Sequence, residues 1–432
     1  MEISALLPFL VMVIALLLGL PIAFALAGAG VLGIYLHTGN WNMVIGILGM
    51  APFSSVSDYA LTTIPMFILM AYFSASSGLA RDLFTAGANW LSHIRGGLAI
   101  ATVFACGIFG AMSGASVAAA SVMSTIAMPE MRRHGYSEEL AAGSIGVGAT
   151  LDILIPPSVA MVIYGIATQT SIGKLLIAGI IPGIIVGIFL AIAILIWVFI
   201  SPSHAPETYR VSSVERWASV FRIWPSLILI LMVLILLYTG VVTPTEVGAI
   251  GAFLSAAIGV ALSRLTWSGA IEALKSTIRT SAMIFMILIG ATIFGSYMAI
   301  SRVPQQVVTI VADMNLNRWV VIIGIVVAYF IVSMFMDEIP LLLLTLQLTF
   351  PLITSLGFDP IWFGVLSMMM VSMGLLFPPV GLIAFIVSAT ANVNLVKVFK
   401  GTSILMIAIV LTTVLIMIFP QIVLWLPATM RR

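Results

Sequence analysis

The sequence predicts an all-α polytopic membrane protein built from two inverted repeats. Three observations lead to this fold class. Hydrophobic residues make up 62% of the 432 residues and charged residues only 7%, whereas a soluble domain carries roughly 25% charged residues. Apolar runs follow one another along the chain, and a set of prolines and glycines recurs in the second half at a constant offset. So much apolar surface is stable only in lipid.

Eight apolar runs are expected to cross the membrane, whose hydrocarbon layer is about 30 Å thick. The first could be mistaken for a signal peptide. Because Glu2 stands where a signal peptide has basic residues, we interpret this run as a retained transmembrane helix. The runs lie near 3–19, 20–36, 60–78, 175–199, 225–239, 244–262, 280–299 and 404–425.

Two longer apolar stretches, 138–169 and 361–391, are interrupted in the middle. The interruptions read GATLDILIPPS at 148–158 and SMGLLFPPVG at 372–381. A proline pair removes two N–H donors and disfavours the α conformation just before it. Lipid cannot satisfy the freed carbonyls, so protein or a water-filled cavity must do so. Two discontinuous helices are therefore expected.

Two further segments, 98–129 and 320–351, consist of two short apolar arms around the tips FGAMSGASV and MFMDEIP. Each arm has about 15 residues, which is too short for a full crossing. We interpret both segments as re-entrant hairpins whose tips lie inside the membrane.

A constant difference in residue number, which we call the repeat offset, relates the two halves of the chain. It aligns Pro129 with Pro351 and Gly135 with Gly357, and it brings both hairpins and both broken helices into the same register. Each repeat then holds five crossings, one of them discontinuous, and one hairpin. An odd number of crossings inverts the second copy. The expected division is a first repeat at 1–200, a cytoplasmic loop at 201–224 and a second repeat at 225–432.

The basic residues indicate which face is cytoplasmic. With both termini outside and each hairpin returning to its own side, 12 of the 17 Lys and Arg residues fall on the face that carries the 201–224 loop. Loops rich in Lys and Arg remain in the cytoplasm. The first hairpin would then open inward and the second outward, so that the two tips meet near the middle of the membrane.

Hairpin tips and helix breaks are where ion-coupled transporters place their binding sites. The first tip, Ser113 to Ser116, offers small residues for close backbone approach and hydroxyls that suit a hard cation. Thr150 and Ser372, one in each break, align under the repeat offset. The alternative is that these small residues only pack helices and that the hydroxyls bond to their own helix.

Three acids, Asp152, Asp337 and Glu338, are expected at membrane depth. A carboxylate there is costly and usually functional. It could bind Na⁺, carry a proton or bind a cationic part of the substrate; alternatively, the tip is simply hydrated. A P-loop and the HExxH and GxSxG motifs are missing from the sequence, and its single cysteine and four histidines show no metal-ligand spacing. Neither ATP hydrolysis nor an organic cofactor is expected.

Several motifs together resemble the large membrane subunit of TRAP (tripartite ATP-independent periplasmic) transporters. They are FGAMSGASVAAASVMSTIAMPEMRRHGY, LDILIPPSVAMVIYG, GVVTPTEVGAIGA, FMDEIPLLLLTLQLTFPL and GLLFPPVGLIAFI, and the resemblance extends from residue 19 to residue 427. It implies a Na⁺-driven elevator-type symporter in a bacterial or archaeal cytoplasmic membrane. It also implies two partners, a small four-helix membrane subunit and a periplasmic binding protein that delivers a small organic acid. Nucleic acid is not an expected partner.

The resemblance and the residue pattern together define the expected sites. The substrate is expected at Ser113, Gly114, Ala115, Ser116, Pro156, Ser158, Glu338, Pro378 and Gly381. Na⁺ is expected at Ser113, Ser116, Gly148, Thr150, Asp152, Asp337, Ser372 and Gly374.

The chain departs from the family pattern at three positions. The family usually has glycine where this chain has Asp152 and proline where it has Leu346, and Glu338 beside Asp337 is unusual. Extra negative charge disfavours a simple dicarboxylate unless Na⁺ intervenes. Two other functions stay open, a carrier that works without a binding protein and, more remotely, an intramembrane enzyme that uses Asp152 and Asp337 as a carboxylate pair.

Overall fold

A computed structural model describes residues 3–206, 208 and 211–430, with helices connected by short turns and no strand among the described residues. The all-helical fold class is therefore confirmed. Six helical segments are long and apolar enough to cross a membrane, and a seventh is gained if the bent pair Ser213–Arg222 and Trp224–Thr239 counts as one span. Shorter apolar helices of 10–17 residues accompany them. The number of crossings in each repeat stays a prediction.

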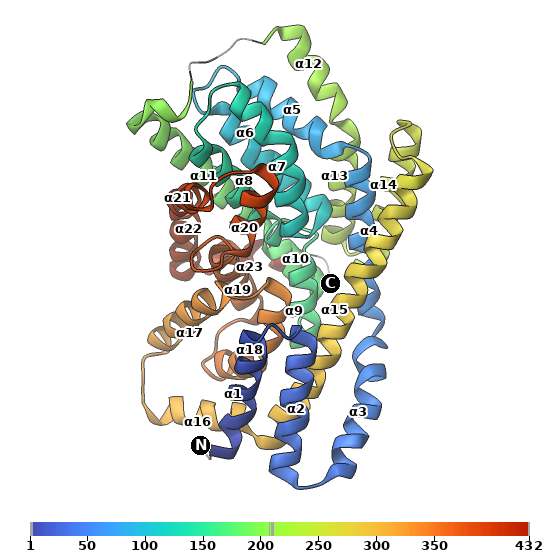
Figure 1. The fold of residues 1–432 in the computed structure, drawn as a ribbon, viewed down its shortest axis with the longest axis vertical. Helices are drawn as coiled ribbons and strands as arrows, with labels where there is room; N and C mark the ends of the chain where they lie inside the picture. The colour runs from blue at the N-terminus through green and yellow to red at the C-terminus, as the bar shows by residue number, and fades with distance from the viewer. Residues whose placement is uncertain (1–2, 207, 209–210, 431–432) are drawn as a thin grey trace.

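The helices follow the sequence repeat (Figure 1). The first half contains α1(Ile3–Leu17), α2(Ile22–Thr38), α3(Trp41–Val56), η1(Tyr59–Thr62), α4(Thr63–Ser76), α5(Leu79–Leu91), α6(Gly97–Ser113), α7(Ser116–Arg133), α8(Glu138–Ala149), η2(Thr150–Ile153), α9(Val159–Thr168), α10(Ile172–Ala178) and α11(Ile180–Ile200). The connecting loop contains η3(Pro202–His204) and α12(Ser213–Arg222). The second half contains α13(Trp224–Thr239), α14(Pro244–Ala261), α15(Trp267–Ser301), α16(Val303–Asp313), α17(Arg318–Ser333), α18(Glu338–Ser355), α19(Pro360–Gly374), α20(Leu382–Ala391), α21(Leu395–Leu405), α22(Ile407–Ile418) and α23(Gln421–Ala428).

Helix starts reproduce the repeat offset at three places. The first residues of α2 and α14, of α7 and α18, and of α8 and α19 are each separated by the same difference in residue number as Pro129 and Pro351. The hairpin arms and the two halves of each broken helix are separate helices, as the short arms and the proline pairs predict. That the hairpins are re-entrant, and that the second copy is inverted, stay predictions.

One pair of corresponding segments differs between the two copies. In the first copy, α3 ends at Val56 and the carboxylate of Asp58 accepts a hydrogen bond from the Ala60 backbone N–H (2.9 Å), which begins a new turn. The second copy has a single continuous helix of 35 residues, α15. This stretch contains no proline that would break the helix. Thr280 aligns with Asp58 under the repeat offset, but it lies inside the continuous helix and its hydroxyl contacts that of Tyr72 at 3.1 Å.

The scattered polar residues of segments 40–58 and 264–279, which hold the same place in each repeat, predict amphipathic connectors that lie along the membrane interface. For 264–279 a separate connector is wrong, because this segment continues into α15 without a break.

The long helix α15 packs against α2, where glycines allow the backbones to approach closely. A Cβ on Gly30 would lie 2.8 Å from the carbonyl carbon of Ile293, and one on Gly290 would lie 2.3 Å from the carbonyl oxygen of Ala23. Together with α4 and α14, these helices form one packed group, in which Thr63 and Thr245 share a buried hydrogen bond of 2.7 Å.

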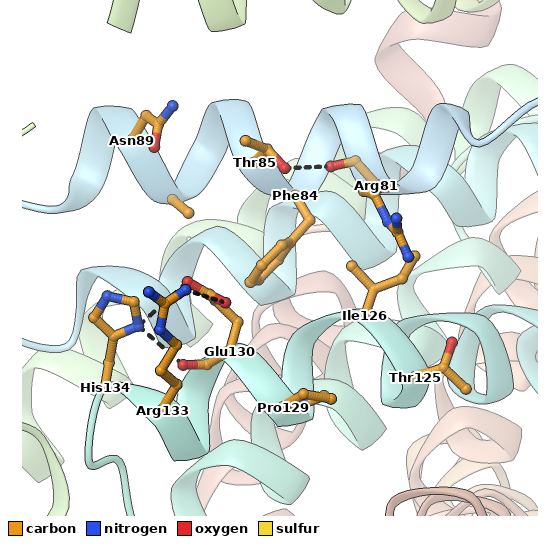
Figure 2. A pocket seen from close by; sticks show the side chains of 11 residues that line it. Arg81, Phe84, Thr85, Asn89, Thr125, Ile126, Pro129, Glu130, Arg133 and His134 are labelled. Atoms are coloured by element: carbon orange, nitrogen blue, oxygen red, sulfur yellow. Dashed lines mark hydrogen bonds and ion pairs between the residues drawn. The ribbon is translucent and has the colours of Figure 1, made fainter. Parts of the chain in front are cut away.

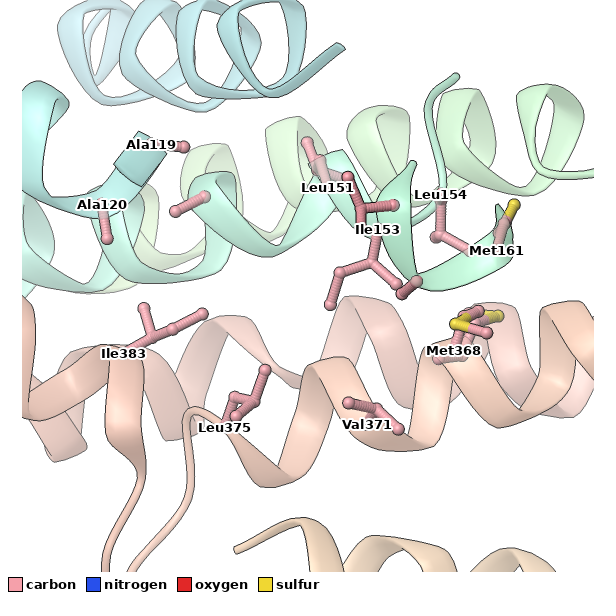
Figure 3. Packing of buried hydrophobic residues seen from close by; sticks show 14 of the residues in the cluster. Ala119, Ala120, Leu151, Ile153, Leu154, Met161, Met368, Val371, Leu375 and Ile383 are labelled. Carbon is pink, nitrogen blue, oxygen red and sulfur yellow. The ribbon is translucent and has the colours of Figure 1, made fainter. Parts of the chain in front are cut away.

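The hairpins and broken helices form a second packed group in which each repeat contacts the other. Helix α7 packs on α20, and α18 packs on α9. Figure 3 shows the apolar layer between them, with Ala119, Leu151 and Ile153 of the first repeat facing Val371 and Ile383 of the second. Both discontinuous helices are therefore held at the interface between the two repeats.

Candidate functional site

The first hairpin tip is a tight turn that exposes a helix N-terminus. Helix α6 ends at Ser113, and Gly114 adopts a left-handed conformation (φ 59°) that favours glycine. A Cβ on Gly114 would lie 3.1 Å from the carbonyl oxygen of Pro157, so the tip packs against the first helix break. Ala115 is extended and provides no side-chain cap for α7. The first backbone N–H groups of α7 thus have no side-chain partner at the Ala115 cap position.

Asp152 joins this tip to the broken helix. It lies in η2 with 1% of its surface exposed, and the Ser116 hydroxyl donates a hydrogen bond of 2.6 Å to its Oδ1 atom. Gly110 makes room for it, because a Cβ on Gly110 would lie 2.4 Å from the Asp152 Cβ atom. The second carboxylate oxygen, Oδ2, is buried without a hydrogen-bond partner among the described residues. An unpartnered carboxylate oxygen at this depth is a candidate cation ligand.

The second hairpin tip carries its own acids. Asp337 caps α18, since its Oδ1 atom accepts a hydrogen bond of 2.9 Å from the Glu338 backbone N–H. The Glu338 side chain is buried, and its Oε2 atom lies 3.3 Å from the Ser116 hydroxyl oxygen. Ser116 and Glu338 are related by the repeat offset and begin equivalent helices. The two hairpin tips therefore meet at corresponding positions.

The other predicted hydroxyls donate to carbonyls of their own chain segments. Thr150 bonds the Val147 carbonyl (2.9 Å), Ser372 bonds that of Met368 (2.9 Å) and Ser113 bonds that of Gly110 (3.3 Å). These hydroxyls therefore donate their protons to nearby carbonyls of the same segment, which is the alternative to ion binding that the sequence left open. Each hydroxyl oxygen keeps lone pairs that can face a cation. Ser158 has a structural role as well, because its hydroxyl caps α9 by accepting a hydrogen bond from Met161 N.

The second helix break packs against its own hairpin. A Cβ on Gly374 would lie 1.7 Å from the Ser333 hydroxyl oxygen, and that hydroxyl contacts the Met370 carbonyl at 3.2 Å. The Gly381 N–H donates to the Met334 carbonyl (3.3 Å). Both breaks contain a cis proline–proline bond, at 156–157 and 378–379. Pro378 is half-buried, whereas Pro156 is buried.

The structure thus brings one subset of the predicted residues together. Ser116, Asp152 and Glu338 form what we call the tip cluster, and Asp337 is next to it in the chain. Ser372, Gly374 and Gly381 are held by contacts within the second repeat. Gly148 packs on α6, since a Cβ there would lie 2.9 Å from the Cys106 Cβ atom.

The tip cluster has excess negative charge. The ion pairs of the described residues involve Glu130, Glu138 and Asp82 and lie elsewhere. Buried carboxylates without basic partners need a proton or a cation. The atoms that could bind a cation here are all oxygens, from carboxylates, hydroxyls and carbonyls. A set of oxygen ligands fits Na⁺. Among the described residues, no group of three or more His, Cys, Asp and Glu side chains is placed to hold a metal ion.

Two cavities beside the hairpins were not predicted from the sequence. One, of about 700 Å³, lies among α3, α9, α15 and α18, and its lining includes Gln347. The other, of about 470 Å³, lies between α5 and α7, and its lining includes Thr125 (Figure 2). Thr125 and Gln347 are also related by the repeat offset, so the cavities occupy related positions on the two hairpins. The repeat offset relates these two positions in the sequence. It does not indicate that either residue lines a cavity.

A family model described as "Tripartite ATP-independent periplasmic transporter, DctM component" matches residues 9–422. The chain belongs to this family. The resemblance noted in the hairpin and helix-break motifs is thereby confirmed over nearly the whole length. A TRAP large permease is a multi-pass protein of the bacterial inner membrane, and this chain is a transporter subunit and not an enzyme.

Curated relatives in the family are named for different substrates. The chain is 32% identical to the C4-dicarboxylate TRAP transporter large permease protein DctM of Pseudomonas aeruginosa, over 88% of this chain and 89% of the relative. It is 31% identical to the ectoine permease TeaC of Halomonas elongata (95% and 96%) and 28% identical to the sialic acid permease SiaM of Vibrio cholerae (95% and 95%). These similar identities do not single out one substrate.

The fold also resembles a solved structure, reported as the crystal structure of the Alcanivorax borkumensis YdaH transporter with an unusual topology. The TM-score is 0.63, and the match covers 96% of this chain and 98% of that one. At 13% sequence identity, this likeness concerns the fold alone.

Proposed function

We propose that this TRAP large permease takes up a small organic acid, delivered by a periplasmic binding protein, in symport with Na⁺. The observation that carries the proposal is the tip cluster, where two hairpin tips and one helix break meet around buried oxygens. Family membership supports a secondary transporter for organic acids that works with a small membrane subunit and a binding protein.

The two tips differ in what they offer to a ligand. The N-terminus of α7 has no side-chain cap, so its N–H groups and helix dipole can receive a substrate carboxylate. The N-terminus of α18 is capped by the carboxylate of Asp337. We infer that the substrate presents a carboxylate to Ser116 and the N–H groups beside it, and that Na⁺ offsets the charge of Asp152 and Glu338. This arrangement disfavours a simple dicarboxylate unless Na⁺ lies between the acids.

The proposed movement is of the elevator type. Helices α2, α4, α14 and α15 pack on one another, and the hairpins and broken helices pack on one another. The first group would act as the scaffold, and the second would carry the site across the membrane. One direct bond between the groups is that from the Gln347 amide nitrogen to the Ala291 carbonyl (3.0 Å).

The test is uptake by proteoliposomes that contain the permease and its small membrane subunit, with the binding protein added outside. We expect uptake only when an inward Na⁺ gradient and the loaded binding protein are both present. Uptake of the free substrate without the binding protein would favour a stand-alone carrier. Uptake driven by a proton gradient in Na⁺-free medium would contradict Na⁺ coupling.

A further inference from the structure

The cavity between α5 and α7 has a polar, basic lining (Figure 2). Helix α5 contributes Arg81, Thr85 and Asn89, and the end of α7 contributes Arg133, followed by His134. Phe84, Ala88, Ile126 and Pro129 form its apolar wall. The volume of about 470 Å³ leaves room for a polar group with an adjoining apolar part.

The basic groups in this cavity are only partly neutralised. Glu130 faces two of them, with its Oε2 atom 3.9 Å from Arg133 Nη1 and its Oε1 atom 3.4 Å from His134 Nδ1. Arg81 forms no ion pair with any described residue. Two guanidinium groups against one carboxylate leave excess positive charge, which favours an anion.

The contact between α5 and α12 indicates the depth of the cavity in the membrane. Trp90 follows Asn89 on α5, and its ring meets that of Trp217 edge to face at 5.6 Å. Its indole N–H donates to the Arg216 carbonyl (3.2 Å). Helix α12, which carries Trp217, leaves Val214 and Phe221 exposed and meets α13 at a bend of 46°. Tryptophans and an amphipathic helix bent away from a span are typical of the membrane–water interface.

We propose that this cavity binds the phosphate group of an anionic phospholipid through Arg81 and Arg133. A guanidinium group binds phosphate through paired hydrogen bonds, and basic pockets between transmembrane helices accept lipid headgroups. The apolar wall receives the adjoining glycerol and the upper part of the chains. A lipid held there connects α5 with the second arm of the first hairpin. This site is separate from the tip cluster and does not depend on the proposed transport reaction.

Lipid retention by the purified permease tests the proposal, measured by native mass spectrometry after exchange into detergent with phosphatidylglycerol or phosphatidylcholine. The wild type should retain phosphatidylglycerol in preference to phosphatidylcholine. The double variant Arg81→Gln/Arg133→Gln should lose about tenfold in affinity for phosphatidylglycerol, because two charge-assisted contacts are removed. Lys400→Gln is the matched control, since it removes an exposed charge outside the cavity, on the same predicted face; its retention should equal that of the wild type.

Equal retention by the double variant and the wild type would overturn the proposal. If the double variant does not assemble, the single variant Arg81→Gln serves instead, because Arg81 is exposed and its loss leaves no buried carboxylate unpaired. Inorganic phosphate distinguishes the two sources of a phosphate group. Complete displacement of phosphatidylglycerol by millimolar phosphate would assign the cavity to a soluble phosphate compound and overturn the lipid assignment, whereas retention of the lipid supports it.

Discussion

At the scale of single residues, the tip cluster depends on one hydroxyl. Ser116 begins α7 and contacts one carboxylate from the first helix break and another from the second hairpin. The two residues it contacts, Asp152 and Glu338, are both acids that the sequence places at membrane depth. Two acids that lie far apart in the sequence therefore meet at the same point of the site.

We expect Ser113, Ser116 and Thr150 to contribute to Na⁺ coordination. Each is buried, and each oxygen keeps a lone pair after donating its proton. In proteoliposomes, replacing each in turn with alanine should raise the Na⁺ concentration for half-maximal uptake by about tenfold, the effect of losing roughly 1.4 kcal/mol of binding. Unchanged Na⁺ dependence in all three variants would remove these residues from the site.

Asp152 and its repeat mate Gly374 should respond differently to substitution. Asp152→Gly restores the residue of the symmetric position, so this variant should assemble normally but show altered substrate preference or cation dependence. Gly374→Ala places a methyl group against Ser333 and should lower stability by about 1–3 kcal/mol. Thermal unfolding in detergent and uptake across a substrate and Na⁺ series measure both effects. Normal transport by Asp152→Gly would make the carboxylate a bystander, and failure to assemble would make it structural.

At the scale of elements, the two repeats are held together by close helix packing. Helix α8 of the first repeat crosses α21 of the second at Gly143 and Gly401, where a Cβ on Gly401 would lie 2.0 Å from the Glu139 carbonyl oxygen. Nearby, Arg132 and Lys397 both donate hydrogen bonds to Glu138, at 2.8 and 3.0 Å. These pairs are exposed and contribute little, so the packing of glycine on glycine dominates this junction.

We therefore expect Gly401→Ala to destabilise the permease. The added methyl group must push α21 away from α8, at a cost of about 1–3 kcal/mol. Gly324→Ala is a suitable control, because nothing lies within 4 Å of the Cβ position there. The melting temperature of Gly401→Ala should fall clearly below that of the control. Equal melting temperatures would show that α8 and α21 can separate at no cost.

At the scale of the whole molecule, opposite ends carry the features that the charge pattern assigns to opposite sides of the membrane. Helix α12 of the connecting loop lies at one end, and the N-terminal region and α16 lie at the other (Figure 1). Helix α23, at the C-terminal end of the chain, lies between these two ends in the same view (Figure 1). Which end faces the cytoplasm is still a prediction from the positive-inside rule.

Labelling with an impermeant thiol reagent tests this orientation. Ser212 caps α12 and is exposed, so a cysteine placed there, in a chain that lacks Cys106, is accessible from one side only. In whole cells it should resist the reagent, and after permeabilisation it should react. Efficient labelling of intact cells would reverse the topology and the directions of both hairpins.

Cross-linking tests the elevator movement. A disulfide between cysteines at Ala291 and Gln347 would tie α15 to α18, which we place in different moving groups. We expect oxidation of this pair to abolish uptake and reduction to restore it. The control pair, Thr63 and Thr245, lies between α4 and α14 within the scaffold, and its oxidation should leave uptake intact. Undiminished transport by the oxidised first pair would exclude this movement.

Much of the fold can be predicted from local features of the sequence. Composition determines that lipid surrounds the chain. The proline pairs determine that each long apolar stretch is interrupted, between α8 and α9 and between α19 and α20, because a missing N–H and a ring clash act locally. The short apolar arms mark α6, α7, α17 and α18 as separate helices. The connector at 264–279 was mispredicted because Thr280, which aligns with the capping residue Asp58, is of a type that can either cap a helix or lie within one. Only the packing of α15 decides between the two.

The site is only partly determined by the sequence itself. The residue pattern selects Ser116, Asp152 and Glu338 as candidates, because small, hydroxyl and acidic residues are unusual at membrane depth. Their meeting is decided by tertiary structure, since residues 116, 152 and 338 come together only when the two repeats pack. Contacts within the first repeat, between α5 and α7, form the basic cavity at Arg81 and Arg133. Local chemistry fixes where helices break, whereas contacts between distant segments depend on the packing of the whole chain.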